Sequence, residues 1–341
     1  MSNTTSNLPP DVPLSEKKSY TKPLLIGFAL LIALCTSIFF LSRKPVKTPS
    51  TAATETPSMP PSMPTQKAAA SDTFCTFIVP HDVRIKDYFT FIDSVVNHFD
   101  TLVLPYKLTE YLLVRSNPFI IDTLENTDYD RMKLRDSFVY DQKQLIVLKK
   151  GDILNIPNLA AADTLKAKLL RTRLDVNIPE FKLRVIEGTD TVYTCPIRVG
   201  QNRKRYLSEV GRDIDLKTRT GKGFIAFNYK KDYFVDPVEG KKFTVTKRDD
   251  GQKTLMPLEP WLEPKMEGQL WGQLIHPTTN PESMGKAYSN GCIGTREGDI
   301  WRIYYYAPVG TKVTVRYDLV PQNGDSVRLK DIYSPKYRKI G

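Results

Sequence analysis

The chain has 341 residues, and its 49 Lys and Arg against 38 Asp and Glu give a formal net charge of +11. This balance is compatible with nucleic-acid binding, but no helix-turn-helix, zinc-ligand or RRM-type signature accompanies it, and an apolar segment near the N-terminus argues against that class. We therefore expect no nucleic-acid partner. A basic surface that faces an anionic polymer is the simpler interpretation.

Residues 23–42 read PLLIGFALLIALCTSIFFLS and contain no charged side chain. At about 1.5 Å per residue, a helix of this length spans roughly 30 Å, the thickness of a bilayer core. Lys and Arg lie on both sides of the segment, so the positive-inside rule does not settle its orientation. We expect a transmembrane signal anchor, with residues 1–22 as a short cytoplasmic tail and the bulk of the chain outside.

Two other interpretations of this segment are weaker. A cleaved signal peptide would have a shorter apolar run and a small-residue cleavage site after it, and neither is present. Lipid attachment at Cys35 is disfavoured because Leu34 precedes that cysteine and the apolar run continues beyond it.

Residues 43–72 are expected to form a linker. Pro, Thr, Ser and Ala dominate this stretch, with few charges and no apolar periodicity, which is typical of a disordered or polyproline-II-like spacer. At about 3.1 Å per residue, the upper reach of its central part, residues 45–70, is roughly 80 Å. The composition leaves open the alternative that this is a featureless linker whose length has no particular role.

Residues 73–170 are expected to form a small α+β domain. Apolar residues at three- and four-residue spacing predict helices over His81–His98 and Leu108–Ser116. The stretch Leu145–Asn158 alternates like a strand and ends in a turn. The plain interpretation is that this domain packs on the one that follows.

Residues 171–321 contain repeated short β-rich runs and are followed by a basic tail, residues 322–341. The pattern predicts a mainly β, β-sandwich-like domain with mostly antiparallel strands. The runs are Lys182–Glu187, Val192–Val199, Phe224–Asn228, Phe243–Lys247 and Lys312–Tyr317.

The stretch HPTTNPESMGKAYSNGCIGTR, from His276 to Arg296, is the strongest candidate for a functional site. It places a histidine and a cysteine sixteen positions apart, and His276 is the only histidine in the C-terminal half. A thiolate at Cys292 would attack a carbonyl, while the imidazole removes the thiol proton and later protonates a leaving amine. A free thiol with a pKa of about 8.5 needs such a base or a positive environment at neutral pH.

The residues around Cys292 fit this chemistry. Gly291 allows close backbone approach, and the amides of Gly291 and Cys292 are expected to point at a developing oxyanion. A helix is predicted to follow, with Thr295 as N-cap, so that its dipole favours an anion at Cys292. On these residues alone the alternative stays open, because a lone cysteine in an apolar context is usually a buried, inert core residue.

The stretch resembles the L,D-transpeptidase (YkuD-like) catalytic domain, whose signature is a histidine followed by a Ser/Thr-x-Gly-Cys turn. Four further pieces match in the right order, so the resemblance covers about residues 171–320. They are LDVNIPEFKLRVIEG (residues 174–188), VYTCPIRVGQ (192–201), TRTGKGFIAF (218–227) and APVGTKVTVRYD (307–318).

The resemblance implies roles for the matching residues. Cys292 would be the acyl-accepting nucleophile and His276 its base. The third member of the family's triad is a main-chain carbonyl after the histidine, which belongs here to Pro277; proline keeps its carbonyl, so the role survives. Ser289 and Gly291 would shape the turn and the oxyanion pocket.

The sequence departs from the family pattern at two positions. Asn290 stands where many members carry a second histidine, so any role of that histidine in substrate orientation is absent or altered. Gly294 stands where many members place an arginine two residues after the cysteine. The nearest arginine, Arg296, could reach the same substrate carboxylate only if the local turn differs.

The resemblance implies an enzyme of the cell envelope that acts on peptidoglycan stem peptides and needs no cofactor. Cys292 would attack the third stem residue of a tetrapeptide donor, release the terminal D-alanine, and pass the acyl group to a neighbouring stem in a 3→3 cross-link. An L,D-carboxypeptidase, attachment of an outer-membrane protein to the wall, and an inactive wall-binding protein are the alternatives.

Three smaller expectations complete the analysis. Leu145–Asn158, with VRSNPFI upstream, faintly resembles LysM-like wall-binding modules. Cys75 and Cys195 could form a disulfide in an oxidising compartment. A zinc site is not expected, because the catalytic region offers one His and two Cys without ligand spacing.

Overall fold

The computed structural model describes residues 72–99, 104–208, 210–321 and 327–337. The predicted anchor at residues 23–42 lies outside the described residues, as do the tail before it and nearly all of the linker after it. No helix of the described ranges is long and apolar enough to cross a membrane.

The region between residues 73 and 171 mixes helices and short strands, as the apolar spacing predicted. The predicted helices are α1 and α2, and the predicted strand run contains β3 and β4. Strand β1 pairs antiparallel with β4, and β2 with β3. The elements are β1 (Thr73–Ile78), β2 (Val83–Arg84), α1 (Ile85–His98), α2 (Glu110–Arg115), α3 (Pro118–Glu125), α4 (Tyr129–Lys133), η1 (Gln142–Gln144), β3 (Ile146–Leu148), β4 (Ile153–Pro157) and α5 (Leu159–Arg171).

The following region is mainly β and ends in one helix and a last strand, which confirms the predicted fold class of this part. Each of the five predicted β-rich runs contains strand residues. The elements are β5 (Thr172–Asn177), β6 (Lys182–Glu187), β7 (Asp190–Pro196), β8 (Val199–Gly200), β9 (Lys204–Leu207), β10 (Arg212–Asp215), β11 (Gly221–Lys231), β12 (Phe234–Val235), β13 (Lys242–Phe243), β14 (Val245–Lys247), β15 (Lys253–Leu255), β16 (Glu259–Met266), β17 (Gln269–Leu270), β18 (Ile275–Pro277), η2 (Pro281–Ser283), β19 (Ala287–Ser289), β20 (Ile293–Thr295), α6 (Glu297–Tyr306), β21 (Lys312–Arg316) and η3 (Pro335–Tyr337).

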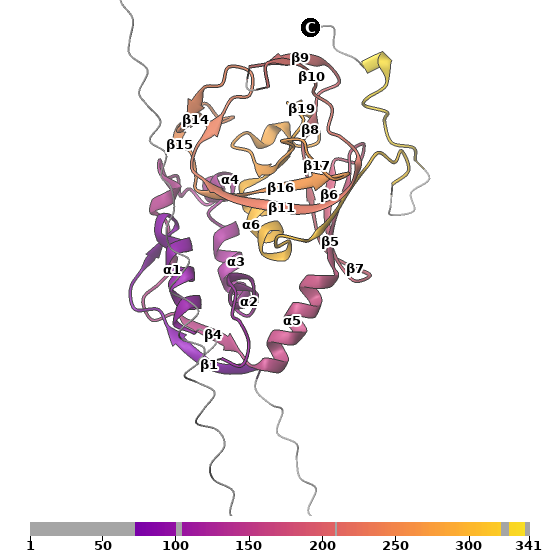
Figure 1. The fold of residues 1–341 in the computed structure, drawn as a ribbon. Helices are drawn as coiled ribbons and strands as arrows, with labels where there is room; N and C mark the ends of the chain where they lie inside the picture. Colours follow the sequence, from indigo (N-terminus) through magenta and orange to yellow (C-terminus); the bar gives the residue numbers. More distant parts are fainter. Residues whose placement is uncertain (1–71, 100–103, 209, 322–326, 338–341) are drawn as a thin grey trace, which may run out of the picture. The chain divides into compact units, whose positions relative to one another are not determined.

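One nine-stranded sheet organises this region (Figure 1). Its order is β20-β18-β16-β11-β21-β5-β6-β7, with β17 paired to β16. Most pairs are antiparallel, but β18 with β20 and β21 with β5 are parallel. The parallel pair β18–β20 matters most for function, because it sets the strand of His276 beside the strand that follows Cys292.

Helix α6 joins the two regions through an aromatic core. Phe89 of α1 stacks on Trp301 of α6 at 5.6 Å between ring centroids. The hydroxyls of Tyr88 and Tyr305 share a buried hydrogen bond of 2.7 Å. Aromatic pairs of this kind contribute about 0.5–1.5 kcal/mol beyond their area burial. The N-terminal α+β region therefore packs on the helix that follows the Cys292 motif, and Figure 1 shows α3 beside that helix.

The prediction that Thr295 caps this helix is wrong. Thr295 is the last residue of β20, and the N-cap position belongs to Arg296, whose side chain makes no capping hydrogen bond. The cap comes from elsewhere in the chain, since a carboxylate oxygen of Asp128 accepts from the Gly298 amide at 2.8 Å. A parallel strand pair holds Thr295 extended opposite Pro277, which sequence spacing alone did not reveal.

Cys75 and Cys195 are both free thiols, so the disulfide considered from the sequence is not formed. Cys195 lies in β7 and is 2% exposed. Burial raises the pKa of its thiol well above the ordinary value. It behaves as a small apolar core residue.

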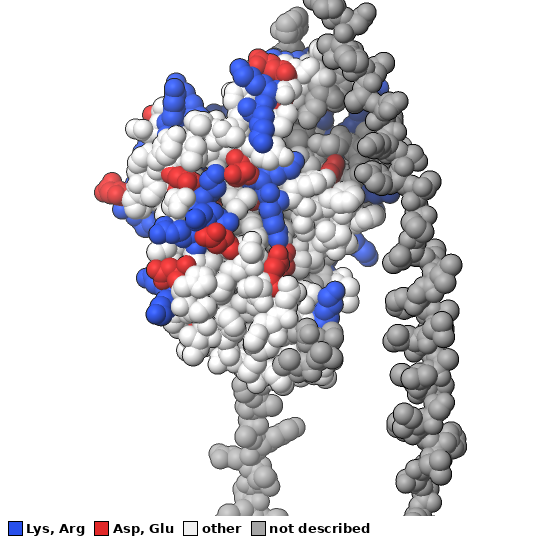
Figure 2. Space-filling model, turned by 60° about the vertical axis from the view of Figure 1, so that its left-hand side comes forward, with Lys and Arg blue, Asp and Glu red and all other residues white. Residues whose placement is uncertain are grey.

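The basic character of the chain does not form an unbroken patch on the face shown in Figure 2. Lys and Arg side chains gather there, but Asp and Glu are interspersed among them. Several are paired, as Lys133 is with Asp250 and Lys143 with Asp232. Surface pairs of this kind contribute about 0–1 kcal/mol each.

Candidate active site

The turn before Cys292 is held by one serine side chain. Ser289, at the end of β19, donates from its hydroxyl to the Cys292 carbonyl at 2.6 Å and accepts from the Gly291 amide at 3.3 Å. Gly291 has φ +114°, a region that favours glycine. The Thr218 hydroxyl donates to the Gly291 carbonyl at 3.0 Å. Ser289 and Gly291 thus shape the turn as the resemblance implied.

Cys292 lies at the junction of this turn and β20. Its Sγ accepts from the Leu274 amide at 3.5 Å and lies 3.8 Å from the Gly272 carbonyl oxygen, so it sits against the chain entering β18. The register of the parallel pair puts Gly294 opposite His276. The structure therefore places Cys292 immediately before the strand that pairs with the strand of His276.

His276 is oriented by the neighbouring main chain. Its Nδ1 lies 2.8 Å from the Pro277 carbonyl oxygen. A carbonyl can only accept, so Nδ1 carries the hydrogen and Nε2 keeps its lone pair. The ring is 6% exposed and stacks on Trp261 at 4.6 Å, with 20° between the ring planes. The imidazole has one tautomer and one orientation, as a positioned base requires.

The electrostatics of the pocket keep His276 neutral. Burial lowers its pKa to about 3, and the nearby cations Arg198 and Lys231 act in the same direction, while the hydrogen bond to Pro277 opposes them. At neutral pH the ring is therefore an uncharged proton acceptor. The positive charge near Cys292 comes from Arg198, whose pKa is lowered by burial and raised in part by the Cys292 sulfur.

Two sequence-based expectations about anion stabilisation are wrong, the one for the Gly291 amide and the one for the helix dipole; the role expected of the Cys292 amide stays a prediction. The Gly291 amide donates to Ser289, so it is not directed at an oxyanion. The helix dipole does not act at Cys292 either, because the three residues of β20 separate the cysteine from α6 and Asp128 accepts from an amide of the helix's first turn. The dipole effect falls off within one turn.

Asn290 and Arg296 complete the list of predicted site residues. Asn290 is half-buried in the turn, and its side chain forms no hydrogen bond within the described ranges. Arg296 is exposed and does not line the pocket that contains His276. Burial raises the pKa of Asp299 and of Asp130, and the charge of Arg296 opposes this rise at both carboxyls. Arg296 therefore does not lie in the cavity where it could bind a substrate carboxylate, as its place in the motif had suggested.

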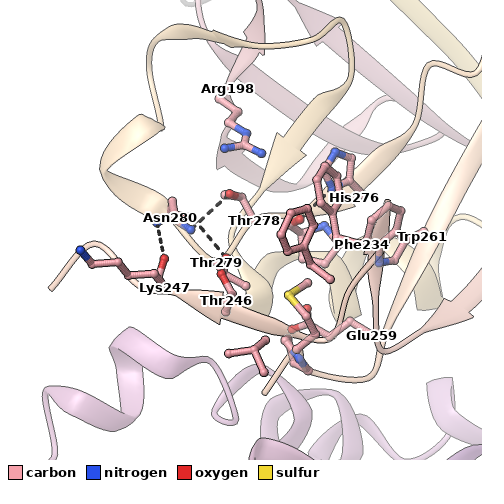
Figure 3. A pocket seen from close by; sticks show the side chains of 15 residues that line it. Arg198, Phe234, Thr246, Lys247, Glu259, Trp261, His276, Thr278, Thr279 and Asn280 are labelled. Carbon is pink, nitrogen blue, oxygen red and sulfur yellow. Dashed lines mark hydrogen bonds between the residues drawn. The ribbon is translucent and has the colours of Figure 1, made fainter. Parts of the chain in front are cut away.

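A cavity of about 300 Å³ opens beside His276 (Figure 3). Arg198 extends toward it from one end and Glu259 lies at the other, with His276 and Trp261 along the wall. Glu259 is 4% exposed, and burial together with the charge of Glu297 raises its pKa well above the ordinary value. The lining of the cavity combines aromatic rings, the neutral His276, the buried carboxyl of Glu259 and the two cations Arg198 and Lys247.

Arg198 lines the cavity but was not among the site residues predicted from the sequence. It lies between β7 and β8, far upstream of the motif, and its side chain runs across Gly294. A signal for it was present, because Gly294 leaves a vacant place where the resemblance expects an arginine, and Arg198 is in one of the matching pieces. In the part of the chain that the structure describes, no group of three or more His, Cys, Asp or Glu could hold a metal ion.

The comparisons with known proteins agree on one family. Residues 171–315 match the sequence model of the YkuD family, the L,D-transpeptidase catalytic domain. No curated protein sequence matches the chain. The segment is the one over which the sequence resemblance runs.

Solved structures similar to the chain are distant. An L,D-transpeptidase from Mycobacterium tuberculosis H37Rv is 15% identical over 43% of this chain and 57% of its own, with a TM-score of 0.28. Residues 123–326 of an L,D-transpeptidase from Xylanimonas cellulosilytica are 12% identical over 58% and 91%, with a TM-score of 0.32. The catalytic domain of the E. faecium enzyme is 16% identical over 42% and 96%, with a TM-score of 0.28.

The alignment spans little more than half the length of the first of these relatives. Likenesses at this level of identity and TM-score carry no activity across, and the family assignment rests on the sequence match. Over residues 171–315, this chain is therefore similar to the L,D-transpeptidase catalytic domain of the YkuD type.

Proposed function

We propose that the chain is a cysteine L,D-transpeptidase that forms 3→3 cross-links in peptidoglycan through a thioester on Cys292. The observation that supports this best is the hydrogen bond of 2.8 Å between His276 Nδ1 and the Pro277 carbonyl oxygen. It leaves Nε2 as the proton acceptor on the strand beside Cys292. A core cysteine without function would have no need of an imidazole held in this way.

Acylation follows from these positions. The Cys292 sulfur forms a bond to the carbonyl carbon of the third residue in a donor tetrapeptide, and its proton passes to His276 Nε2. The bond between that carbon and the nitrogen of the terminal D-alanine breaks, and the same proton goes to the leaving amine. The buried, neutral imidazole is ready to accept that proton across the neutral pH range.

Deacylation repeats the proton transfer in the opposite sense. An amine of a neighbouring stem bonds to the thioester carbon, the carbon–sulfur bond breaks, and the amine proton returns through His276 to the sulfur. Water as acceptor would make the enzyme an L,D-carboxypeptidase. A chain that keeps the fold but has no turnover would be a wall-binding protein. The differences from the family pattern at Asn290 and Gly294 are the reason to consider this alternative.

The proposed location is the cell envelope, where L,D-transpeptidase domains act. Residues 23–42 would anchor the chain in the cytoplasmic membrane, and the linker would place the catalytic domain outside or in the periplasm. The membrane anchor rests on the sequence alone. Residues 73–170, in part LysM-like by sequence, would support the catalytic domain through α6.

The test is mass spectrometry of a disaccharide-tetrapeptide incubated with the full chain, beside its Cys292→Ala variant. A dimer that lacks one D-alanine, formed only by the cysteine form, would support the transpeptidase. Tripeptide alone would mean that water is the acceptor. No product and no mass increase on Cys292 would favour the wall-binding alternative.

A second experiment is independent of the acceptor. Structures of two relatives contain a faropenem-derived adduct and imipenem. We expect prolonged exposure to a carbapenem to add the mass of one acyl group to this chain, on the peptide that contains Cys292. The Cys292→Ala variant should stay unmodified, and a wild-type protein without any adduct would count against a competent nucleophile.

A further inference from the structure

The side chain of Arg198 lies directly against the Cα of Gly294. Their main chains form two hydrogen bonds, Arg198 N to Gly294 O at 2.9 Å and Gly294 N to Arg198 O at 3.0 Å. A Cβ at residue 294 would lie 2.5 Å from Arg198 Nε and 2.6 Å from its Cγ. Real Cβ atoms essentially never approach other atoms so closely, so the arginine lies where a side chain at residue 294 would begin.

The guanidinium of Arg198 is short of partners. Its Nη1 donates to the Ser283 hydroxyl at 3.2 Å, and its buried Nε has no hydrogen-bond partner. Among the described residues no carboxylate forms an ion pair with it, whereas Arg248, another buried arginine, is paired with Glu297. A buried arginine without an anion is costly, and a ligand that supplies the anion is one explanation for its presence.

Among the described residues that line the cavity beside His276, none forms an ion pair with Arg198, and Asp249, outside the lining, is the weakest of the groups that raise its pKa. His276 is neutral at neutral pH, and burial raises the pKa of Glu259 well above its ordinary value, which favours the uncharged carboxyl. Lys247 also lines the cavity, but its ammonium group points away from it in Figure 3. An anionic group that enters from the open side would meet one planar, hydrogen-bonding cation, the geometry that suits a carboxylate.

We propose that Arg198 is the residue that binds a carboxylate of the donor stem peptide, and that the glycine at residue 294 is what gives it room. This inference rests on the proposed function and deepens it. The cation that the family pattern supplies two residues after the cysteine is supplied here from the neighbouring chain segment. The ligand carboxylate is either that of the terminal D-alanine or the side-chain carboxylate of the diamino acid.

The alternative role for Arg198 is to stabilise a thiolate at Cys292, because the two groups interact electrostatically. The two roles differ in one measurable respect. A carboxylate anchor distinguishes a peptide acid from its amide, whereas a cation that acts on the sulfur affects both peptides equally.

The experiment measures binding by calorimetry to the full-length Cys292→Ala protein, with and without Arg198→Gln. The ligands are a stem tetrapeptide, its terminal amide, and the peptide amidated on the diamino acid. We expect Arg198→Gln to weaken binding of the free acid by about 10- to 100-fold, as for loss of a charge-assisted hydrogen bond. One of the two amides should bind equally to both proteins, and which amide does so identifies the carboxylate.

The relocated variant Arg198→Ala/Gly294→Arg tests the exchange of position, and we expect it to regain the preference for the acid. Lys312→Gln, on the exposed side of β21, is the control and should bind as the parent does. Thermal melting of each variant shows whether it is folded, and a folded relocated variant without the preference counts against the exchange.

The outcomes separate the inference from the proposed function. Equal losses for acid and amides on Arg198→Gln, or no binding of any of the three peptides, would overturn the inference. If the wild-type chain turns over the tetrapeptide and Arg198→Gln does not change peptide binding, the inference about Arg198 is overturned and the proposed function stands. Arg198-dependent binding without any turnover would support it and overturn the transpeptidase proposal alone.

Discussion

Two buried polar clusters of this chain differ in how completely their charges are paired. The first joins Arg248 of the β14–β15 segment to Glu297 of α6, and its Nε and Nη2 donate to Thr254 at 2.8 Å and to Gln142 at 2.6 Å. Glu297 also accepts from the Tyr129 amide at 3.0 Å. The guanidinium of Arg248 and the carboxylate of Glu297 therefore each have hydrogen-bond and ion-pair partners.

The second cluster lines the cavity beside His276. Arg198 has one hydrogen bond to a hydroxyl and no carboxylate partner within the described chain, and Glu259 has no side-chain hydrogen bond there. Nδ1 of His276 donates to the Pro277 carbonyl, and Nε2 is available to accept a proton. Within the described chain, Arg198 Nε is the atom of this cluster that is buried without a hydrogen-bond partner.

The contrast separates groups that hold the fold from groups that await a ligand. A fully paired buried network fixes one arrangement of the elements that it joins, here α4, η1, β15 and α6. An under-paired one lowers stability and is retained where binding or catalysis uses it. Changes in the first cluster should reduce stability, and changes in the second should reduce activity.

The largest effect on activity is expected from Cys292→Ala. Removing the nucleophile should lower turnover by more than about 10⁴-fold. Because the side chain is half-buried at a turn, the free energy of unfolding should change by less than about 1 kcal/mol. Cys195→Ala is the matched control: this buried thiol should cost stability and leave thioester formation intact. If turnover were lost in the Cys195 variant and kept in the Cys292 variant, Cys292 would not be the nucleophile.

His276→Gln should slow thioester formation by about two to four orders of magnitude at neutral pH. Glutamine can keep a hydrogen bond to Pro277 but cannot accept and return a proton. The measurement is single-turnover acylation followed by mass spectrometry, with folding monitored by circular dichroism. An unchanged rate in a folded variant would remove His276 from the mechanism.

Arg248→Ala should cost about 3–5 kcal/mol of unfolding free energy, because it leaves the buried Glu297 carboxylate without its cation. Arg198→Gln should change the same quantity by less than about 1 kcal/mol, since no buried anion loses a partner. Urea unfolding of both variants measures the difference. Equal destabilisation by the two changes would remove the distinction between the clusters.

Sequence reasoning identified the contiguous part of the site. His276, Pro277, Ser289 and Cys292 lie within one short motif. Residue type suggested the Cys–His pair, and the resemblance to the family supplied the expected roles of Pro277 and Ser289. The β-rich runs were also predictable, because alternation is a local pattern. The expectation of a catalytic domain over residues 171–321 came from the resemblance of its motifs to the L,D-transpeptidase family.

The parts that were missed depend on contacts between distant segments. Arg198 reaches the site across Gly294 from another strand segment, and Asp128 caps α6 from the N-terminal region. The stacking of Trp261 on His276 depends on the neighbouring strands β16 and β18. None of these pairings has a periodicity or spacing that one sequence reveals, and Thr295 looked like a cap because its strand is only three residues long.

The smallest expected effect is on the pH dependence of stability. The pKa of His276 is about 3 in the folded protein and near its ordinary value when unfolded, so the unfolded chain binds more protons between these values. Stability from this group is therefore complete above about pH 6.5 and is lost as pH falls toward 3. Lowering the pH to 4.5 should cost roughly 2 kcal/mol more in the wild type than in His276→Gln.

The difference between the two proteins is the informative quantity. Glu259, whose pKa is raised, changes stability in the opposite direction, and the cations Arg198 and Lys231 stay charged, so these groups are common to both proteins and largely cancel. Denaturant unfolding at pH 7 and pH 4.5 gives the comparison. Parallel losses in both proteins would mean that the imidazole is solvated and already titrates normally, and the second cluster would then be less buried than its geometry indicates.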